Sequence, residues 1–330
     1  MDIDLRHLRH ARALAEHGNF GRAARALRLS QPALSRSIAE LERQVGTRLF
    51  DRSTAGIEPT DMGSLLLERA GELLARSEDL GREMDSLQGR GAGALRIGAG
   101  TYTAEMLGGD ALAALLRGSP DVQARVVVDN VLNLLPLLRR RELDIVIGDA
   151  SVITDDPEFH ITGLAPRQGY FVCRKRHPLA KQPSLTLKDI LAFPLVSTSR
   201  LPPRLLGPIV AAARRSASPA DVHTAPAITC ESLGIMKSIV AGSDAIAILP
   251  LTAMVGEQAS ALFTVLPLVE PWLQGKFAII RLARRTPPPS GEVFVRLLLA
   301  KDAELTRVTA AMEARLVADR RPAPAARRRK

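Results

Sequence analysis

The segment from residue 31 to residue 45 carries side chains that can hydrogen bond with the exposed edges of DNA bases. Arg can bond bidentately to guanine, Gln to adenine and Ser to either base, and this segment supplies Gln31, Ser35 and Arg36. At 100° per residue its apolar side chains gather on one face of a helix, almost opposite Arg36. These apolar residues are Leu34, Ile38, Leu41 and Val45. The outer face is slim, polar and basic, as a helix that enters a DNA major groove must be. Arg43 shares this face, where it can pair with Glu40 or remain solvated.

A second set of polar side chains follows apolar segments that read as β-strands. In an open parallel sheet, ligands bind beyond the carboxyl ends of the strands, so these side chains are candidate ligand contacts. They are Thr101, Tyr102, Thr103, Asn130, Asp149, Ser197, Thr198, Thr229 and Ser232. Their hydroxyl groups fit a small polar ligand, such as an anion at a helix N-terminus, held between two lobes. The alternative is that they only cap helices and form turns, with Tyr102 as a stacking wall or a lid.

Motifs for catalysis are absent from the sequence. GAGTYT (98–103) follows an apolar segment as a dinucleotide-binding loop does, but Thr103 occupies its third glycine position. The nucleophile-elbow, phosphate-loop and H-E-x-x-H patterns are also missing. We therefore predict that the protein is not an enzyme and has neither a cofactor nor a metal site.

The histidines and cysteines support the same prediction. His7 and His10 have a spacing compatible with a metal ion, but no third ligand is arranged nearby, which favours a plain surface pair. Cys173 and Cys230 are too few for a disulfide framework or a four-ligand zinc site. A redox sensor would need an accessible thiolate at Cys230, whereas buried, inert thiols are the interpretation that we favour.

Helices dominate the first part of the chain. Hydrophobic periodicity predicts a helix over residues 5–17. Asn19 is a good N-cap for a second helix over 21–27, and Ser30 for a third, in whose first turn Pro32 is tolerated. Two short helices joined by a tight turn have the geometry of a helix-turn-helix.

A long amphipathic helix is predicted over residues 61–88, with Thr60 as its N-cap and Asp61 in its first turn. Its seam positions lie alternately four and three residues apart, as a coiled coil requires. They are Leu66, Ala70, Leu73, Ser77, Leu80, Met84 and Leu87. At 1.5 Å per residue this helix is about 42 Å long, so we predict that it pairs with a second copy. The alternative is that it packs against its own domain.

Short apolar segments alternate with helical ones after a flexible break at GRGAG (89–93). The predicted strands are ALRIGAG (94–100), VQARVVVDN (122–130), LDIVIGD (143–149), YFVCRK (170–175), PLVSTS (194–199), AIAILP (245–250) and KFAIIRLA (276–283). This alternation predicts parallel α/β units. A further helix is predicted over 290–316, and the Pro/Ala/Arg-rich tail at 320–330 is predicted to be disordered.

The segment Phe20–Gly63 resembles the winged helix-turn-helix of LysR-type transcriptional regulators. The matching landmarks keep their order and spacing over more than 40 residues. They are AA at 23–24, SQPALSRSI at 30–38, LE at 41–42, GTRLFDR at 46–52 and TDMG at 60–63. One departure is Ala11, where the family usually has a bulky aromatic side chain.

The resemblance implies roles for individual residues. Gln31, Ser35 and Arg36 would read bases, with Pro32 in the same contact surface. Arg52, in the wing, would reach the minor groove or the backbone. The remaining two, Ser30 and Thr60, would lie near phosphates.

The resemblance also implies an α+β multidomain architecture. A winged helix-turn-helix with a long linker helix precedes a two-lobed α/β effector domain that resembles a periplasmic binding protein. The implied boundaries are 1–60 for the DNA-binding domain, 61–88 for the linker helix, 89–93 for a hinge, 94–302 for the effector domain and 303–330 for a C-terminal helical extension and basic tail. Within the effector domain, lobe one would be 94–163 plus 269–302, and lobe two 164–268.

The function implied is that of a transcriptional regulator. A homodimer, assembling into a homotetramer through its effector domains, would bind a pseudo-palindromic double-stranded operator. A small-molecule effector between the lobes would change DNA bending and RNA polymerase recruitment. The alternatives are a cytoplasmic small-molecule-binding protein that uses its N-terminal region only to oligomerise, and a two-lobed enzyme, which the missing catalytic motifs disfavour.

Charge and hydropathy set outer limits on these interpretations. The net charge is +10, but six basic residues lie in the last eleven, so the tail supplies most of the excess. This tail can be a second phosphate contact or simply a solvated end, which we favour. No apolar run reaches the length of a membrane span, and the N-terminus lacks the apolar core of a signal peptide. We therefore expect a cytoplasmic protein without a membrane partner.

Overall fold

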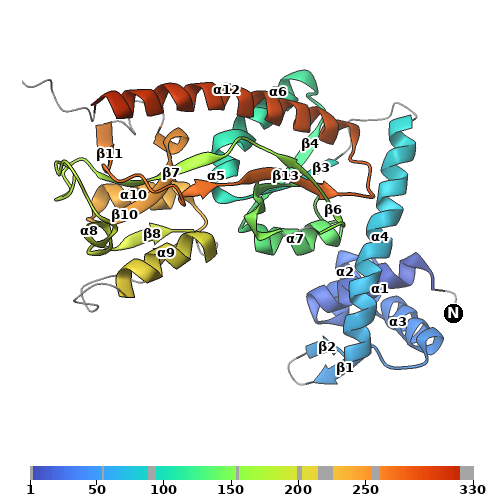
Figure 1. Ribbon diagram of the computed structural model, residues 1–330. Helices are drawn as coiled ribbons and strands as arrows, with labels where there is room; N and C mark the ends of the chain where they lie inside the picture. The colour runs from blue at the N-terminus through green and yellow to red at the C-terminus, as the bar shows by residue number, and fades with distance from the viewer. Residues whose placement is uncertain are drawn as a thin grey trace, which may run out of the picture. The chain divides into compact units, whose positions relative to one another are not determined.

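The computed structural model describes residues 3–53, 56–87, 94–153, 156–198, 203–214, 226–254 and 261–319 (Figure 1). The chain divides into two compact units, which are described separately. The first covers residues 1–91 with 136–143, and the second covers 92–135 and 144–330. The predicted break at 89–93 and the predicted tail at 320–330 lie outside the described residues.

Three short helices, a hairpin and a long helix form the first unit. They are α1 (Leu5–His17), α2 (Phe20–Ala26), α3 (Gln31–Val45), β1 (Phe50–Ser53), β2 (Gly56–Pro59) and α4 (Asp61–Leu87). The predicted caps are confirmed, because the Asn19 side chain accepts a hydrogen bond from the Arg22 amide at 3.1 Å and the Ser30 side chain accepts one from the Ala33 amide at 3.3 Å. The helix-turn-helix that the sequence predicts is therefore present.

The apolar stripe of α3 forms the centre of this unit, as its periodicity predicts. Leu34, Ile38 and Leu41 are buried, whereas Val45 is half-buried at the end of the helix. The stripe packs against buried side chains from α1, α2 and the start of the hairpin. These are Ala11, Leu14, Ala23, Ala24, Leu49 and Phe50. Burial of this face leaves the opposite face of α3 exposed.

The wing is an antiparallel hairpin in which Phe50 lies opposite Pro59 and Ser53 opposite Gly56. Helix α4 begins directly after it and passes close to the backbone of β1. A Cβ atom on Gly63 would lie 2.0 Å from the carbonyl oxygen of Leu49, so only glycine fits at this position. The glycine of the TDMG landmark therefore lets the linker helix start against the wing.

The predicted coiled-coil seam of α4 divides into two parts. Ala70 is buried with Leu8 of α1, and Leu66 packs against the same cluster, so this end of the helix packs within its own domain. Farther along, Leu73, Leu80 and Met84 are all more than half exposed. The alternative of packing against its own domain holds for the first part, and the second part keeps an uncovered apolar face.

The second unit contains two mixed β-sheets. The first has the strand order β4-β3-β5-β13-β6 and the second β11-β7-β10-β8-β9, with β12 paired to β7. The strands are β3 (Ala94–Ala99), β4 (Gln123–Val128), β5 (Ile145–Asp149), β6 (Phe159–Gly163), β7 (Arg167–Arg174), β8 (Leu195–Ser197), β9 (Ile228–Thr229), β10 (Ile246–Pro250), β11 (Phe263–Val265), β12 (Gln274–Gly275) and β13 (Phe277–Leu282).

The sheets confirm the predicted strands but not a purely parallel arrangement. Strand β3 runs parallel to β4 and β5, and β8 runs parallel to β9 and β10. In contrast, β13 and β7 are antiparallel to their partners, because the chain passes from the first sheet to the second after β6 and returns before β13. Each of these two crossings between the sheets places a strand that is antiparallel to its neighbours. Strands β6, β9, β11 and β12 were not among the predicted strands.

Helices flank both sheets. They are α5 (Thr101–Thr103), α6 (Gly109–Gly118), α7 (Val131–Arg139), α8 (Leu187–Leu191), α9 (Pro203–Arg214), α10 (Leu233–Gly242) and α12 (Pro289–Asp319), and the π-helical turn η1 (Ala104–Gly108) joins α5 to α6. Short 3-10 turns, η2 (Ala150–Val152) and η4 (Leu251–Met254), follow β5 and β10.

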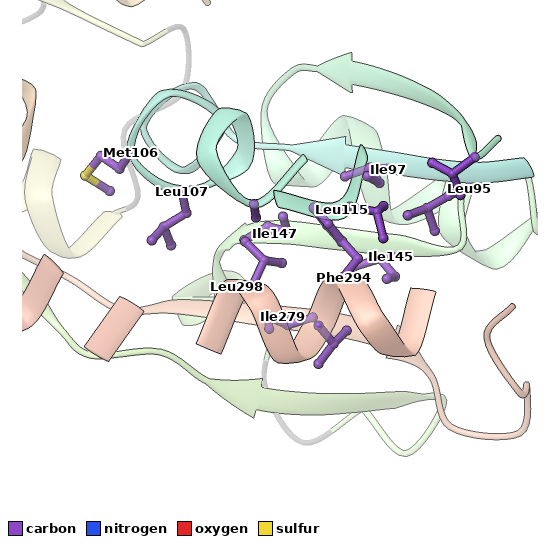
Figure 2. Close-up of a cluster of buried hydrophobic side chains, with 13 residues drawn as sticks. Leu95, Ile97, Met106, Leu107, Leu115, Ile145, Ile147, Ile279, Phe294 and Leu298 are labelled. Atoms are coloured by element: carbon purple, nitrogen blue, oxygen red, sulfur yellow. The ribbon is translucent and has the colours of Figure 1, made fainter. Parts of the chain in front are cut away.

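Helix α12 packs against the cores of both sheets. Near its start, Phe294 and Leu298 are fully buried against the isoleucines of the first sheet (Figure 2). Near its end, Met312 and Leu316 pack on the core of the second sheet, and the Tyr170 hydroxyl is 3.1 Å from Oε1 of Glu313. The predicted helix beyond residue 302 is thus present, and it runs along both lobes (Figure 1).

Candidate DNA-binding surface and ligand cavity

The outer face of α3 presents the side chains that the sequence proposes for base reading. Gln31, Pro32 and Arg36 are exposed, and Ser35 is half-buried on the flank of the helix. Arg36 makes no hydrogen bond or ion pair with any described residue, so its guanidinium is available to an external acceptor. The burial of Leu34 and Ile38 on the other side of the helix holds this face outward.

Arg43 pairs within the helix rather than remaining solvated. Its Nε and Nη2 atoms lie 2.8 and 2.5 Å from the two carboxylate oxygens of Glu40. These hydrogen bonds lower the pKa of the Glu40 carboxyl to about 2, well below its usual range. Because Arg43 already has an anionic partner, Arg36 is the better placed of the two for contact with DNA.

The other proposed DNA contacts hold different positions. Ser30 is exposed, but its hydroxyl caps α3. The Thr60 hydroxyl donates to the Arg48 carbonyl oxygen and accepts from the Gly63 amide, both at 3.0 Å, so it caps α4 as predicted. Arg52 lies in β1 opposite Ile57, and its side chain is outside the described part of the chain. Phosphate contacts by these three residues stay predictions.

The second unit contains a cavity of about 150 Å³ between the two sheets. Residues at the carboxyl ends of β3, β4 and β5 form one side of it. Residues of β10, Thr198 directly after β8 and the loop before α10 form the other. Six of the nine proposed ligand contacts line this cavity. They are Thr101, Tyr102, Thr103, Asn130, Asp149 and Thr198. Reasoning from strand ends therefore predicted residues that lie together at this cavity, and their contact with a ligand stays a prediction.

The remaining three proposed contacts lie outside the lining. Ser197 is buried and donates its hydroxyl to the Thr198 carbonyl oxygen at 2.8 Å. Thr229 is exposed in the edge strand β9, and the Ser232 side chain caps α10 by accepting from the Ile235 amide. Ser232 thus has the alternative role that the sequence allowed, because its side chain caps a helix.

Most of the cavity wall is apolar, which differs from the expected polar ligand site. The lining includes Val131, Leu132, Val152, Leu205, Ile248, Leu249, Pro250, Leu273 and Phe277. The hydroxyl groups that suggested a polar site are largely engaged inside the protein. Thr103, for example, donates to the backbone oxygens of Gly100 and Ile147. The sequence shows which hydroxyl groups are present, but it does not show which oxygen atoms accept their hydrogen bonds.

Side chains from the two lobes bond to each other across the cavity. The Thr101 hydroxyl donates to Oε2 of Glu231 at 2.5 Å, and the Tyr102 hydroxyl donates to the Ile248 carbonyl oxygen at 3.0 Å. Tyr102 packs against the cores of both lobes, which makes it a wall rather than a lid. Burial, with a smaller effect from Glu231, raises the pKa of its phenol, so Tyr102 stays a neutral donor.

Two arginines near the cavity are held by carboxylates. Arg204 pairs with Asp149 across the lobes and also donates to the Gln274 carbonyl oxygen. Arg167 is buried, with Nη2 2.5 Å from Oδ1 of Asp302 and Nη1 3.0 Å from the Thr306 hydroxyl. Sequence analysis missed these arginines, together with Glu231 and Asp129, because their positions depend on contacts between distant segments.

The cysteines and histidines show no arrangement for chemistry among the described residues. Cys173 is fully buried in β7, and burial raises the pKa of its thiol to about 12. His10 Nδ1 lies 2.7 Å from the Ser37 hydroxyl oxygen. No group of three His, Cys, Asp or Glu side chains that could hold a metal ion occurs in the described part of the chain. Across those same residues, none of the helices is long and apolar enough to cross a membrane.

Two family models match this chain. The model described as "Bacterial regulatory helix-turn-helix protein, lysR family" matches residues 5–64, and "LysR substrate binding domain" matches residues 88–303. The chain is also 34% identical over 304 residues to the SDS degradation transcriptional activation protein of Pseudomonas sp. (strain ATCC 19151), which covers 91% of this chain and 97% of that protein. It is 33% identical to the HTH-type transcriptional regulator GbpR of Azospirillum brasilense over 54% of this chain and 52% of that protein.

Solved structures share the fold at lower sequence identity. A full-length OxyR variant from Pseudomonas aeruginosa has a TM-score of 0.65 at 22% identity, over 90% of this chain and 95% of that one. The LysR family regulator CbnR has a TM-score of 0.63 at 20% identity, over 91% of this chain and 99% of that one. These likenesses show the fold that the chain shares with those proteins.

Proposed function

The chain belongs to the LysR family of transcriptional regulators, and from this premise we propose how it recognises DNA and how its output is controlled. It is a DNA-binding regulator with an effector domain. We assign base reading to Gln31, Ser35 and Arg36, with Pro32 in the same surface and Ser30, Arg52 and Thr60 near the DNA backbone. The exposed, unpaired guanidinium of Arg36 is the observation that carries this assignment.

The protein acts as a homodimer that uses the exposed part of α4. Leu73, Leu80 and Met84 are 51%, 59% and 53% exposed, which is costly for an apolar seam without a partner. Two copies that pair along this seam place two reading heads on two half-sites, so the operator is pseudo-palindromic. Pairing of effector domains then gives a tetramer.

The cavity holds the small-molecule effector. Bonds across the cavity join the lobes in the present arrangement, among them those of Thr101 and Tyr102. A ligand changes the equilibrium between arrangements only if it binds one of them more tightly. Such a change alters the spacing of the reading heads and the recruitment of RNA polymerase. The Pseudomonas relative is named a transcriptional activation protein, which supports transcriptional output as the result.

The protein carries out no catalysis and uses no cofactor in this proposal, and it acts in the cytoplasm. The apolar cavity supports a binding role, because its described polar groups are engaged with each other rather than arranged as a nucleophile and a base.

The test compares two arginines of α3. Arg36→Ala should weaken binding to the operator by roughly 1–3 kcal/mol, because one bidentate base contact is lost. Arg43→Ala is the matched control, since Arg43 is already paired with Glu40. Fluorescence anisotropy would measure both variants on the operator located in the DNA upstream of the gene, and size-exclusion chromatography with light scattering would verify that each remains a dimer. Equal affinities of Arg36→Ala and the unmodified protein would contradict the assignment.

A further inference from the structure

The turn that joins α2 to α3 holds an arginine in a backbone conformation that favours glycine. Arg28 has a φ of 56°, in the left-handed region. Its amide donates to the Arg25 carbonyl oxygen at 3.1 Å, and the Leu29 amide donates to the Ala24 carbonyl oxygen at 2.8 Å. Glycine is the usual residue where a helix ends with these two hydrogen bonds, because a side chain in this conformation is strained. The side chain of Arg28 therefore makes this turn less stable than a glycine would.

Residues in strained conformations concentrate at functional sites. Among the described residues, the other non-glycine residue with a positive φ is Arg141, and its guanidinium pairs with Asp79 of the same compact unit at 2.5 Å. Arg28, in contrast, is exposed, and its guanidinium makes no hydrogen bond or ion pair with any described residue. The described residues thus provide no anionic partner for Arg28.

The segment around Arg28 contains basic residues and no acidic ones. Between Glu16 and Glu40 the sequence has four arginines and neither Asp nor Glu. Arg22, Arg25 and Arg28 follow one another at intervals of three residues along α2 and the turn after it, and all three are exposed. A segment of exposed arginines without acidic residues attracts a polyanion such as the phosphate backbone of DNA.

The place of this turn in the helix-turn-helix favours DNA as the partner. In such motifs the N-terminal residues of the second helix contact base edges in the major groove. Arg28 lies two residues before Ser30, the N-cap of α3, and Gln31 in the first turn of α3 is exposed. Phosphates border the groove that this end of α3 enters, and arginine side chains commonly bind them.

We propose that Arg28 is a phosphate-contacting residue that holds the N-terminal end of α3 at the major groove. This inference rests on the proposed function, because it requires α3 to enter the groove. The guanidinium donates to a phosphate oxygen, and such a contact carries no sequence information. Arg28 therefore raises the affinity for DNA in general and leaves the choice of bases to Gln31 and Arg36.

Three substitutions of Arg28 separate the effect of charge from that of backbone strain. Arg28→Ala removes the charge, Arg28→Lys keeps it, and Arg28→Gly removes both the charge and the strain. Each phosphate contact contributes about 0.9 to the slope of log affinity against log salt concentration, so a dimer on two half-sites should lose about 1.8 in Arg28→Ala and in Arg28→Gly. Arg28→Lys should keep the slope. Fluorescence anisotropy of the full chain would measure the slopes on the operator and on a scrambled duplex of the same length.

Thermal unfolding provides a readout that a merely structural role of Arg28 would not explain. Arg28→Gly should raise the midpoint of unfolding, because glycine adopts the left-handed conformation without strain. The same variant should bind DNA more weakly. A protein that becomes more stable and yet loses affinity for DNA has lost a contact rather than its fold.

Two further variants serve as controls. Arg69→Ala removes the same charge from an exposed position of α4 where Arg69 pairs with Glu72 at 3.3 Å, and it should leave the salt slope unchanged. Arg36→Ala should reduce the preference for the operator, whereas Arg28→Ala should weaken binding to both duplexes by the same factor. An unchanged slope in Arg28→Ala, or a loss confined to the operator, would overturn the proposal. An unchanged slope with lower transcription in vitro would assign Arg28 to a protein partner instead.

Failure of this inference is distinguishable from failure of the proposed function. If the protein binds both duplexes equally and Arg28→Ala still lowers both slopes, sequence-specific regulation fails and the phosphate contact stands. If the protein prefers its operator and Arg28→Ala keeps the slope of the unmodified protein, the regulatory function stands and the phosphate contact fails.

Discussion

The reading face of α3 and the ligand cavity are built in opposite ways. The reading face depends on one helix, whose exposed positions Gln31, Pro32 and Arg36 follow from the apolar stripe opposite them. The cavity depends on contacts between segments far apart in the chain, such as the bond between Thr101 and Glu231. Local periodicity is therefore enough to show which side chains of α3 are exposed, and the family resemblance adds their proposed role. The cavity, in contrast, takes its chemistry from tertiary packing.

The largest expected effect on stability concerns the contact between α12 and the first sheet, in the unit that contains the cavity. Phe294→Ala should reduce the free energy of unfolding of this unit by about 3–5 kcal/mol, because the phenyl ring is fully buried between α12 and the first sheet. Urea denaturation would measure this loss. Leu299→Ala, at a partly exposed position of the same helix, should cost much less. Equal losses for the two variants would show that the α12 contact contributes little.

In the DNA-binding unit, a single substitution at the start of α4 should have an effect of comparable size on stability. Gly63→Ala should cost about 1–3 kcal/mol or more, because the new Cβ would overlap the Leu49 carbonyl oxygen. Gly71→Ala in the same helix meets no atom within 4 Å and should instead stabilise the unit by up to about 1 kcal/mol. Thermal unfolding of both variants would reveal the opposite signs. The same sign for both would contradict the close approach of α4 to the wing.

A smaller effect on stability is expected for the hydrogen bond that the Tyr102 hydroxyl makes across the cavity. Tyr102→Phe removes the donor to the Ile248 carbonyl oxygen and should lower the free energy of unfolding by about 0.5–1.5 kcal/mol, which urea denaturation would measure. Tyr170→Phe removes an equivalent hydroxyl that contacts Glu313 on α12, outside the cavity. It should lower the free energy of unfolding by a similar amount. No loss of stability in Tyr102→Phe would contradict the hydrogen bond between Tyr102 and the Ile248 carbonyl oxygen.

The same contrast explains what the sequence could predict. Caps at Asn19 and Ser30, the stripe of α3 and the longer central strands of both sheets follow from short-range patterns, and the structure confirms them. Six of the nine proposed ligand contacts line the cavity because strands end at a shared edge. Glu231 was missed although its neighbours Thr229 and Ser232 were proposed, because only the folded chain brings its carboxylate to Thr101.

The antiparallel strands and the division of α4 into two parts could not be predicted from local sequence patterns either. Both depend on contacts between segments far apart in the chain. The direction of β13 depends on the return of the chain from the second lobe. The heptad pattern of α4 is continuous in sequence, yet Ala70 packs within its own domain and Leu80 does not, because α1 reaches only the first part of the helix.

The most direct test of the central claim is the affinity of the purified protein for the DNA upstream of its own gene, compared with scrambled DNA across a salt series. Fluorescence anisotropy should show tight binding to one pseudo-palindrome that survives competitor DNA, with a preference that Arg36→Ala reduces. Equal, steeply salt-dependent binding to both DNAs would show charge attraction alone. That result would contradict sequence-specific reading by α3 and would favour a small-molecule-binding protein that uses its N-terminal region only for oligomerisation.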